Sequence, residues 1–382
     1  PSFLVKLSYK IEKQGKYEMS SVHQLYHQLN EQLIELWSWK RPEHRKVLAW
    51  LMVAIFVGKD VCIDRLGVNL PREAKPESIG QQFRRWLKNK AIDERLIYDP
   101  IARNVLQKVR CRRFRIQLDR VQIKKRQNVL MMTIWHRNRA IPLAWICLPH
   151  SGSSHLAHWV ELLDYLEQIL PHDAQVIILA DREFGSVDRL RYVEKKNWDY
   201  AIRLKGSLFF YDPSWQYPFD WCTLNQIAPL VGKSYVIPDL RLTKGDLYLT
   251  HVACAWAVGS DEPWFIATNL KRPIHALKEY RRRFGCEELF SDLKKRGFNW
   301  EDTMIRDPER ISRLLLALAL LVVMLLNLGR HLRLARLDLE ILSPSHRCRL
   351  SLFQTARRWL KRRLARDLFP DFLFRDIFFQ FT

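Results

Sequence analysis

The sequence predicts an α/β protein in which a mixed β-sheet is preceded and followed by helical segments. Three β-rich runs, RFRIQLDRVQI, NVLMMTIWH and AIPLAWICL, follow one another between residues 113 and 149. Helical and strand-like runs then alternate as far as residue 205. Apolar side chains recur at helical spacing before and after this region.

Residues 1–105 are expected to form a helical DNA-binding domain. The runs VHQLYHQLNEQLIELWSW and HRKVLAWLMVAIFVG have helical periodicity. The turn NLPREAKP then leads to the basic helix ESIGQQFRRWLKNK, an order similar to a helix-turn-helix DNA reader. Its candidate groove or phosphate contacts are Gln81, Gln82, Arg84, Arg85 and Lys88. A plain helical bundle with a solvated basic face is the alternative.

Residues 106–205 are expected to form the first part of a catalytic core. The three β-rich runs are joined by tight polar turns, the pattern of an antiparallel meander. The helix HLAHWVELLDYLEQIL, the apolar strand AQVIILA, the helix SVDRLRYVEKKN and the strand DYAIRLK follow. A strand as apolar as VIILA is typical of burial on both faces of a parallel sheet. This order of elements predicts a ribonuclease-H-like mixed sheet.

The alternation stops between residues 206 and 263. This segment contains Pro213, Pro218, Pro229 and Pro238, with strand-like runs between them, and is interpreted as a β-rich insertion. Residues 264–300 then complete the core, with the strand WFIATNL and the long helix IHALKEYRRRFGCEELFSDLKKRG.

A C-terminal helical region is expected over residues 301–382. Its run from Leu314 to Leu328 is apolar for fifteen residues. A membrane-spanning helix needs about 20, so a buried core helix is favoured. The following run ARRWLKRRLARDLF is a basic amphipathic helix suited to DNA, to another subunit or, less well, to a membrane surface.

The composition favours a polyanion as partner. Lys and Arg number 63 and Asp and Glu 41, which gives a net charge of +22. A positive field of this size indicates nucleic acid rather than membrane. The seven cysteines form no C-x-x-C pair, so a zinc ribbon or a disulfide framework is not expected and a reducing compartment fits best.

Two aspartates are candidate metal ligands. Asp181 directly follows the apolar run VIILA, and the carboxyl ends of strands are where α/β sheets bind ligands. Asp119 lies on the first strand of the meander, on the same face as Arg115 and Gln117. In a ribonuclease-H-like sheet these two strands are neighbours, so both carboxylates could share a cation. A turn aspartate at 181 and an exposed aspartate on a solvated face at 119 are the alternatives.

The long helix after the insertion carries a charged face. At about 100° per residue, Tyr280, Arg283, Glu287 and Lys294 fall within about a sixth of the helix circumference. An acid flanked by two bases and a phenol suits a metal ligand among groups that hold phosphates. A charged helix with ordinary ion pairs is the alternative.

The three carboxylates together indicate phosphoryl-transfer chemistry. Two aspartates on adjacent strands and a glutamate on a following helix can hold two divalent ions about 3.5–4 Å apart, which activates the attacking oxygen and stabilises the leaving oxygen. Oxygen ligands select hard cations, so the expected cofactor is Mg²⁺ or Mn²⁺, two ions per active site.

The spacing Y-x2-R-x3-E-x6-K, met by Tyr280, Arg283, Glu287 and Lys294, resembles the signature of bacterial DDE transposases of the insertion-sequence-four family. ADREFG around Asp181 and the run WFIATNL are similar to further blocks of that family. The resemblance covers residues 113–297.

The resemblance implies a role for each of these residues. Asp119, Asp181 and Glu287 would be the metal-binding catalytic triad. Tyr280, Arg283 and Lys294 would grip phosphates near the cleaved transposon end. Trp264 looks like the position on which a flipped base stacks in members that cut DNA through a hairpin. A tryptophan that anchors the insertion to the sheet is the alternative for Trp264.

The resemblance implies a DNA transposase that cuts transposon ends and transfers strands to target DNA. The expected route is cut-and-paste, and one version of this route passes through a hairpin intermediate. The expected partners are the inverted repeats at the transposon ends, target DNA and a second copy of the chain. No Walker motif is found, so ATP use is not expected. No membrane partner is expected, and the predicted location is the bacterial cytoplasm, associated with the nucleoid. The alternatives are a ribonuclease-H-like nuclease without strand transfer, a catalytically inactive DNA-binding descendant and a membrane-associated basic protein.

Overall fold

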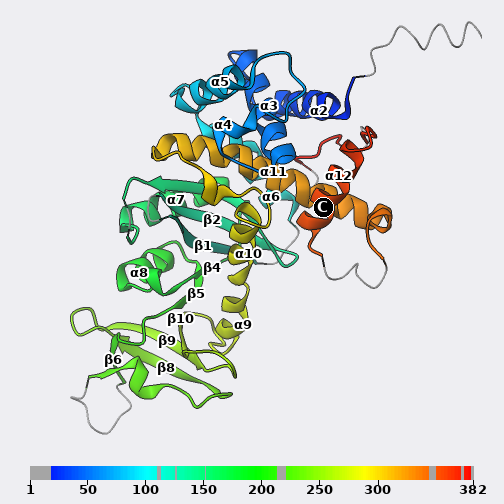
Figure 1. The fold of residues 1–382 in the computed structure, drawn as a ribbon. Coiled ribbons are helices and arrows are strands. Elements are labelled where there is room, and N and C mark those ends of the chain that lie inside the picture. Colours follow the sequence, from blue (N-terminus) through cyan, green and yellow to red (C-terminus); the bar gives the residue numbers. More distant parts are fainter. Residues whose placement is uncertain are drawn as a thin grey trace, which may run out of the picture. The chain divides into compact units, whose positions relative to one another are not determined.

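A computed structural model describes residues 19–109, 113–124, 127–150, 152–212, 221–343, 350–370 and 374–379 (Figure 1). The predicted α/β class is confirmed. Pro213 and Pro218 of the predicted insertion, and residues 1–18 of the predicted helical domain, lie outside the described residues. The helices and short 3-10 turns are α2 Ser21–Leu36, α3 Pro42–Gly58, α4 Ile63–Leu66, α5 Pro76–Lys88, α6 Glu94–Lys108, α7 Leu156–Ile169, η1 Arg182–Phe184, α8 Val187–Lys195, η2 Leu224–Ile227, α9 His275–Arg281, α10 Phe284–Leu293, η3 Trp300–Asp302, α11 Pro308–Leu334, η4 Leu337–Glu340 and α12 Leu352–Leu364.

The strands are β1 Phe114–Ile123, β2 Gln127–His136, β3 Arg139–Leu148, β4 Val176–Ala180, β5 Asp199–Arg203, β6 Phe209–Tyr211, β7 Cys222–Thr223, β8 Ser234–Leu242, β9 Tyr248–Ala255 and β10 Trp264–Thr268. They form one mixed sheet in the order β3-β2-β1-β4-β5-β10-β9-β8-β6-β7. The meander β1–β3 is antiparallel, whereas β4 pairs in parallel with both β1 and β5. Every residue of β4 is buried, as its unbroken apolar run predicts. This arrangement is consistent with a ribonuclease-H-like fold.

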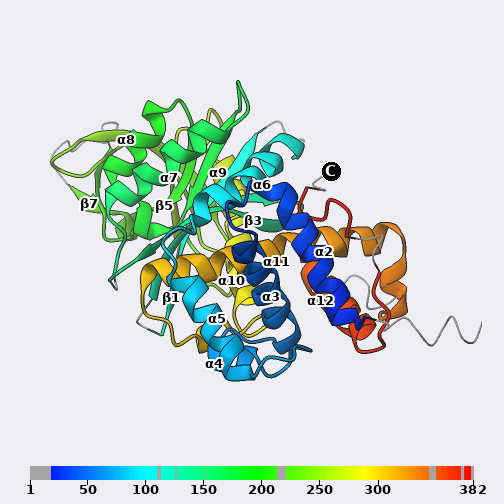
Figure 2. The ribbon, with the colours of Figure 1, turned by 90° about the horizontal axis from the view of Figure 1, so that it is seen from above.

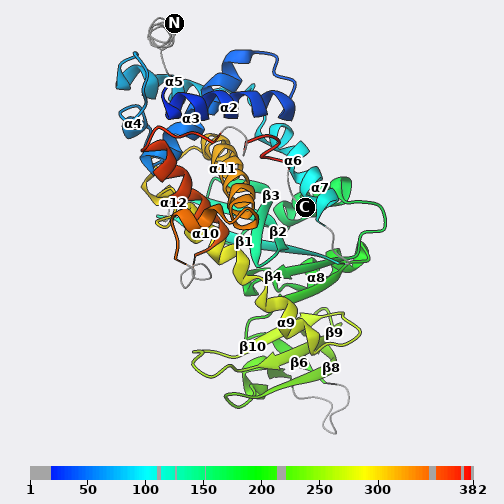
Figure 3. The ribbon, with the colours of Figure 1, turned by 90° about the vertical axis from the view of Figure 1, so that its right-hand side faces the viewer.

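The segment predicted as a β-rich insertion extends the same sheet. Strand β10 is antiparallel to β5 on one side and to β9 on the other, and β8, β6 and β7 continue outward from β9. Helix α9 packs against β5, β9 and β10, and lies over this part of the sheet in Figure 3. The returning strand β10 therefore joins the core sheet to the strands of the predicted insertion.

The central strands have helices on both sides. In Figure 1, α7 and α8 lie on one side of β1, β4 and β5, and α9 and α10 on the other. Because successive side chains of a strand point to opposite faces, Ile116 and Leu118 of β1 point to one side and Gln117 and Asp119 to the other. All four are buried, so neither face of β1 is open to solvent at this point.

The chain forms two compact units. The first contains Pro1–Trp86 and Leu321–Phe378, and the second contains Leu87–Leu320 with the last four residues. In the first unit, α2 and α3 run side by side (Figure 2), and the leucines of α2 are fully buried. The last described residues close over this pair, because the Ser21 backbone N–H donates to Asp367 and the Ile377 N–H donates to Gln32. The core of this unit thus combines segments from before residue 87 and after residue 320.

Helix α11 begins in the second unit and continues into the first. It has 27 residues, nearly twice the length of the apolar run that predicts it. It is the one described helix long and apolar enough to cross a membrane, but its most apolar stretch is fully buried inside the protein. The expectation that the segment is too short to span a bilayer is therefore wrong for the helix as a whole. The predicted buried core helix agrees with the structure.

Candidate active site

The two candidate aspartates lie side by side. In the parallel register of β1 and β4, Leu118 is opposite Ala180, and Asp119 and Asp181 are the residues that follow them. Strand β4 ends at Ala180, while β1 continues through Asp119 to Ile123. Asp119 is only 9% exposed, so the alternative of an aspartate on a solvated strand face is wrong.

The predicted long helix is broken in the middle. It divides into α9 and α10, and Arg282 and Arg283 lie between them. Successive backbone bonds here run from residue i to i−3, for example from Arg283 N to the Tyr280 carbonyl at 2.9 Å and from Cys286 N to the Arg283 carbonyl at 2.9 Å. A 3-10 turn rotates each residue further than an α-helix does. The single face predicted at 100° per residue is therefore not formed as one continuous surface.

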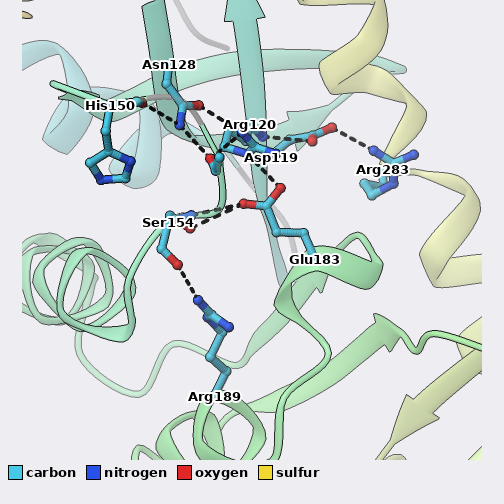
Figure 4. A network of polar contacts seen from close by, with 9 residues as sticks. Asp119, Arg120, Asn128, His150, Ser154, Glu183, Arg189 and Arg283 are labelled. Atoms are coloured by element: carbon cyan, nitrogen blue, oxygen red, sulfur yellow. Dashed lines mark hydrogen bonds and ion pairs between the residues drawn. The ribbon is translucent and has the colours of Figure 1, made fainter. Parts of the chain in front are cut away.

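The break nevertheless brings three of the four signature residues to the aspartates. The Tyr280 hydroxyl donates to Asp181 Oδ1 at 2.9 Å. One guanidinium nitrogen of Arg283 donates to Asp119 Oδ2 at 2.6 Å, and the other donates to Glu287 Oε1 at 2.7 Å. Figure 4 shows the side chain of Asp119 pointing toward Arg283. Arg283 is thus the link between the sheet aspartate and the helix glutamate.

Polar residues on the same face of β1 hold these helices on the sheet. Arg115 forms two hydrogen bonds with Glu279 of α9, at 2.6 and 3.1 Å. The Gln117 side chain donates to the carbonyl of Arg282 in the break. Sequence reasoning placed Arg115, Gln117 and Asp119 on one face but gave no role to the first two. The alternation was the signal, and a buried polar face needs partners of this kind.

The charges of the site shift the pKa of both aspartates. Burial, and to a smaller extent the charges of Asp181 and Glu287, raise the pKa of Asp119 to about 6 against the opposing effects of Arg283 and the Arg120 backbone N–H. Burial acts in the same direction on Asp181, but Arg283, the Arg182 backbone N–H and the Tyr280 hydroxyl together lower its pKa below the usual value. The same acidic neighbours raise the pKa of Arg283 despite its burial, so this residue stays charged.

The arrangement does not fit a metal ion. Among the described residues, no group of three or more His, Cys, Asp and Glu side chains lies close enough together to hold one. The chemistry of the three carboxylates suits Mg²⁺, but the Arg283 guanidinium bridges Asp119 and Glu287. The positive charge between Asp119 and Glu287 is therefore the guanidinium group of Arg283, in the place that a metal ion would need.

Lys294 is the signature residue that the structure does not bring to the aspartates. It directly follows the last residue of α10, and its ammonium group lies 3.3 Å from Glu301. It lines a hollow of about 490 Å³ together with Glu287, Phe290 and Arg120. Lys294 therefore lines the same hollow as Glu287 but contacts none of Asp119, Asp181 and Glu287.

Trp264 begins β10 and packs against signature residues. Its ring is edge-on to Tyr280, at 5.1 Å between centroids, and stacked on Phe284, at 6.0 Å. It is partly buried against the core cluster that contains Ile266 and Leu277. This packing fits the anchoring alternative, and stacking on a flipped base stays a prediction.

The candidate DNA contacts of the helical domain lie on α5. Phe83 and Trp86 are its buried side, and Gln81, Arg85 and Lys88 are exposed. The other two candidates have partners within the helical unit: Gln82 accepts a 2.9 Å hydrogen bond from Arg72, and Arg84 pairs with Asp64. The sequence spacing of Gln81, Arg85 and Lys88 puts them on one face of α5, where they are exposed and available to a ligand.

A second polar network fixes the turn after Asp181 (Figure 4). Arg120 donates to Glu183 at 2.6 Å, and its other nitrogen donates to Asn128 and to the Gly152 carbonyl. Glu183 also accepts from the Ser154 backbone N–H at 3.3 Å. Arg120 directly follows Asp119 and Glu183 is two residues after Asp181, so their ion pair ties together the two segments that carry the carboxylates. Neither residue was predicted, because an arginine and a glutamate on separate segments show no pairing in sequence.

A hollow of about 810 Å³ opens next to Asp181. Its basic lining residues are Arg120, Arg182, Arg189 and Lys205. Its acidic lining residues are Asp181, Glu183, Asp188 and Asp246. The hollow thus combines four bases with four acids, and its bases could contact phosphates of a ligand.

Residues 147–324 match the family model described as Transposase DDE domain. No curated protein matches the chain. The matched range contains Asp181 and Glu287 and begins after Asp119. DDE transposases generally use divalent metal ions, and a transposase domain implies DNA binding. The match supports a DDE transposase, an enzyme of the polynucleotidyl-transferase type.

Proposed function

We propose that this protein is a DNA transposase that cuts the ends of a mobile element and joins them to target DNA. The observation that carries the proposal is the Arg283 guanidinium bonded to both Asp119 and Glu287, with Asp181 at the end of the neighbouring strand and two of the three carboxylates inside the region that matches the transposase domain. The net charge of +22 supports a polyanionic substrate.

The proposed roles follow the resemblance. Asp119, Asp181 and Glu287 are the catalytic carboxylates and the proposed ligands of Mg²⁺ or Mn²⁺, two ions per active site. Since the present arrangement does not fit a metal, binding requires Arg283 to leave its place between Asp119 and Glu287. A guanidinium freed in this way can donate two parallel hydrogen bonds to a phosphate. The proposed phosphate contacts Tyr280, Arg283 and Lys294 would thus exchange a carboxylate partner for DNA.

Each chemical step is proposed as an in-line displacement at phosphorus. Water first breaks the bond at the transposon end and leaves a 3′-hydroxyl. That hydroxyl then attacks either the opposite strand, which gives a hairpin, or target DNA, which gives strand transfer. Before DNA binds, the Tyr280 hydroxyl holds Asp181 in one orientation, and Arg115 and Gln117 keep the helix break on the sheet.

The wider assembly is part of the proposal. Two ends must be brought together, so a homodimer on DNA is expected, with Gln81, Arg85 and Lys88 of α5 as contacts to the end sequence. Gln82 and Arg84 would join them only after giving up their present partners. Neither ATP nor a membrane is required, and the bacterial nucleoid is the proposed location.

A second candidate function is a catalytically inactive DNA-binding descendant of a transposase. The observation that favours it is the bridging position of Arg283, because an arginine that never leaves the carboxylates would prevent metal binding. A nuclease that keeps the triad but hydrolyses DNA without joining it is distinguished only by its products.

The test uses labelled DNA that carries the sequences flanking the gene for this protein. Products are resolved on a denaturing gel with and without Mg²⁺, for the natural protein and for Asp181→Asn. The matched control is Asp173→Asn, the same chemical change at a turn residue whose side chain is 88% exposed. Metal-dependent cuts at a defined end, with hairpin or joined products lost only in Asp181→Asn, are expected. Cleavage without joining favours the nuclease, and binding without cleavage favours the inactive descendant.

A further inference from the structure

Helix α12 has one face packed inside the first unit. Phe353, Ala356, Trp359 and Leu360 are at most 1% exposed. The helix is held at its start by the Ser351 hydroxyl, which accepts from the Gln354 N–H at 3.1 Å. Gly329 of α11 permits the close approach of the Leu352 backbone, since a Cβ there would lie 2.2 Å from the Leu352 carbonyl oxygen. The orientation of α12 within the unit is therefore fixed.

The opposite face carries four exposed bases. Arg358, Lys361 and Arg362 lie on the helix, and Arg366 lies in the turn that follows it. At 100° per residue they span an arc of about 140°, and at 1.5 Å per residue a length of about 12 Å. We call these four residues the α12 basic stripe.

The stripe is not neutralised by the protein. Among the described residues, none of its four side chains has an ion-pair or hydrogen-bond partner. The nearby acids are engaged elsewhere: Glu340 accepts from Trp359 and Arg363, at 3.0 and 3.2 Å, and Asp367 accepts from the Ser21 backbone. Four uncompensated bases on one fixed surface repel one another, which disfavours the folded state unless an anion is bound.

A hollow lies beside the stripe. It measures about 350 Å³ and is lined by Arg362, Arg363 and Arg366 together with Glu340, Ile341 and Trp359. Glu340 is already paired with Arg363, so the other two guanidinium groups remain to receive an anion. Planar guanidinium groups that converge on one hollow suit a phosphate better than an apolar ligand.

The observations favour duplex DNA over the other anionic partners. A membrane-bound amphipathic helix inserts its apolar face, but the apolar face of α12 is buried in the unit. A second copy of a chain with a net charge of +22 offers no general charge complementarity. Duplex DNA carries a charge every ~1.7 Å along its axis, so a stripe about 12 Å long can meet several phosphates at once.

We propose that the α12 basic stripe binds the sugar–phosphate backbone of duplex DNA, as a contact surface separate from the carboxylates and from α5. The inference rests on the proposed function only in that the substrate is DNA. The stripe contacts phosphates and no base edge is assigned to it, so its contribution to affinity is independent of sequence.

The test measures binding of a random-sequence duplex of about 30 base pairs by fluorescence anisotropy, in EDTA, over a range of salt concentrations. The full-length natural protein is compared with a variant in which Arg358, Lys361, Arg362 and Arg366 are all replaced by Gln. A matched control replaces four scattered exposed lysines by Gln: Lys108, Lys195, Lys233 and Lys244. Both variants lose the same net charge, so a difference between them reports position rather than total charge. Thermal unfolding of each protein shows whether it is folded.

The slope of log K against log salt becomes shallower by about 0.9 for each phosphate that the protein no longer neutralises. If each of the four bases neutralises one phosphate, we expect the stripe variant to have a slope shallower by about 3.6, and the control to keep the natural slope to within about 1. Equal slopes for the two variants would overturn the inference. So would a stripe variant that binds DNA normally but loses binding to phosphatidylserine vesicles or changes its oligomeric state in light scattering.

The outcomes also separate this inference from the proposed function. If the natural protein cuts transposon-end DNA and the stripe variant keeps the natural slope, the stripe inference alone is wrong. If the slope changes as expected but no end is cut, the stripe binds DNA and the proposed transposase activity is wrong.

Discussion

Replacement of Asp119 by Asn should stabilise the metal-free protein at alkaline pH. Burial and two neighbouring acids raise the pKa of Asp119 from its usual 3.8 to about 6 in the folded state. The folded protein therefore binds this proton more tightly than the unfolded chain. Between about pH 4 and pH 6 the free energy of unfolding falls as the pH rises, and the full loss is present above pH 6.

The size of the effect follows from the same values. A pKa raised from 3.8 to about 6 corresponds to a loss of about 3 kcal/mol at pH 8. Asn carries no charge and escapes this loss, but it accepts one hydrogen bond fewer, which costs about 1 kcal/mol. The expected net gain for Asp119→Asn is about 2 kcal/mol at pH 8, and it disappears near pH 4.

Urea denaturation followed by tryptophan fluorescence, in EDTA at pH 8, 6 and 4.5, measures this gain. Asp173→Asn, at its exposed turn, is the control and should match the natural protein at every pH. A variant that is less stable than the natural protein at pH 8, or whose advantage is the same at pH 4.5, would contradict the electrostatic account of the site.

Three further perturbations test neighbouring contacts. Arg283→Met removes the cation between Asp119 and Glu287. Mn²⁺, measured by electron paramagnetic resonance, should therefore bind the DNA-free variant at least tenfold more tightly than the natural protein, a gain of about 1.4 kcal/mol or more. An unchanged affinity would show that Arg283 does not compete with metal. Tyr280→Phe removes the hydrogen bond to Asp181, so the free energy of unfolding should fall by about 1 kcal/mol. The pKa of Asp181, followed by NMR of its carboxyl carbon, should rise. An unchanged pKa of Asp181 would argue against the contact. Gly185→Ala would place a Cβ 2.5 Å from the Arg203 carbonyl oxygen, so unfolding by urea should show a loss of about 2 kcal/mol, which Gly245→Ala, in an open turn, should not share.

The central sheet could be predicted because each of its strands carries a local signal. VIILA is apolar on both faces, and the β1 run alternates, so burial and facing could be deduced without knowing any partner. The positions of Asp119 and Asp181 then follow from the register of two neighbouring strands. Their places depend on strand geometry alone, whereas their selection as catalytic residues rests on the combination with Glu287 and on the resemblance to DDE transposases.

The break between α9 and α10 could not be predicted in the same way. The sequence around Arg282 and Arg283 contains no proline, and the charges on both sides fit a continuous helix. What accompanies the break is tertiary: Arg115 and Gln117 bind the segment from the sheet, and Arg283 binds Asp119. The ion pair of Arg120 with Glu183 was missed for the same reason, since such partners become visible only when the strands are side by side.

The core of the first unit combines residues up to Trp86 with residues from Leu321 onward, so it is completed only late in protein synthesis. Ribosomes add about 5–20 residues per second, so roughly 15 to 60 s separate Trp86 from Phe378 during synthesis. Through that interval the second unit can be completed, while the buried leucines of α2 still lack the segments that carry Asp367 and Ile377. A message truncated before codon 350 would therefore yield a chain with its central sheet complete and its first helices left with exposed apolar faces, a natural substrate for chaperones and proteases.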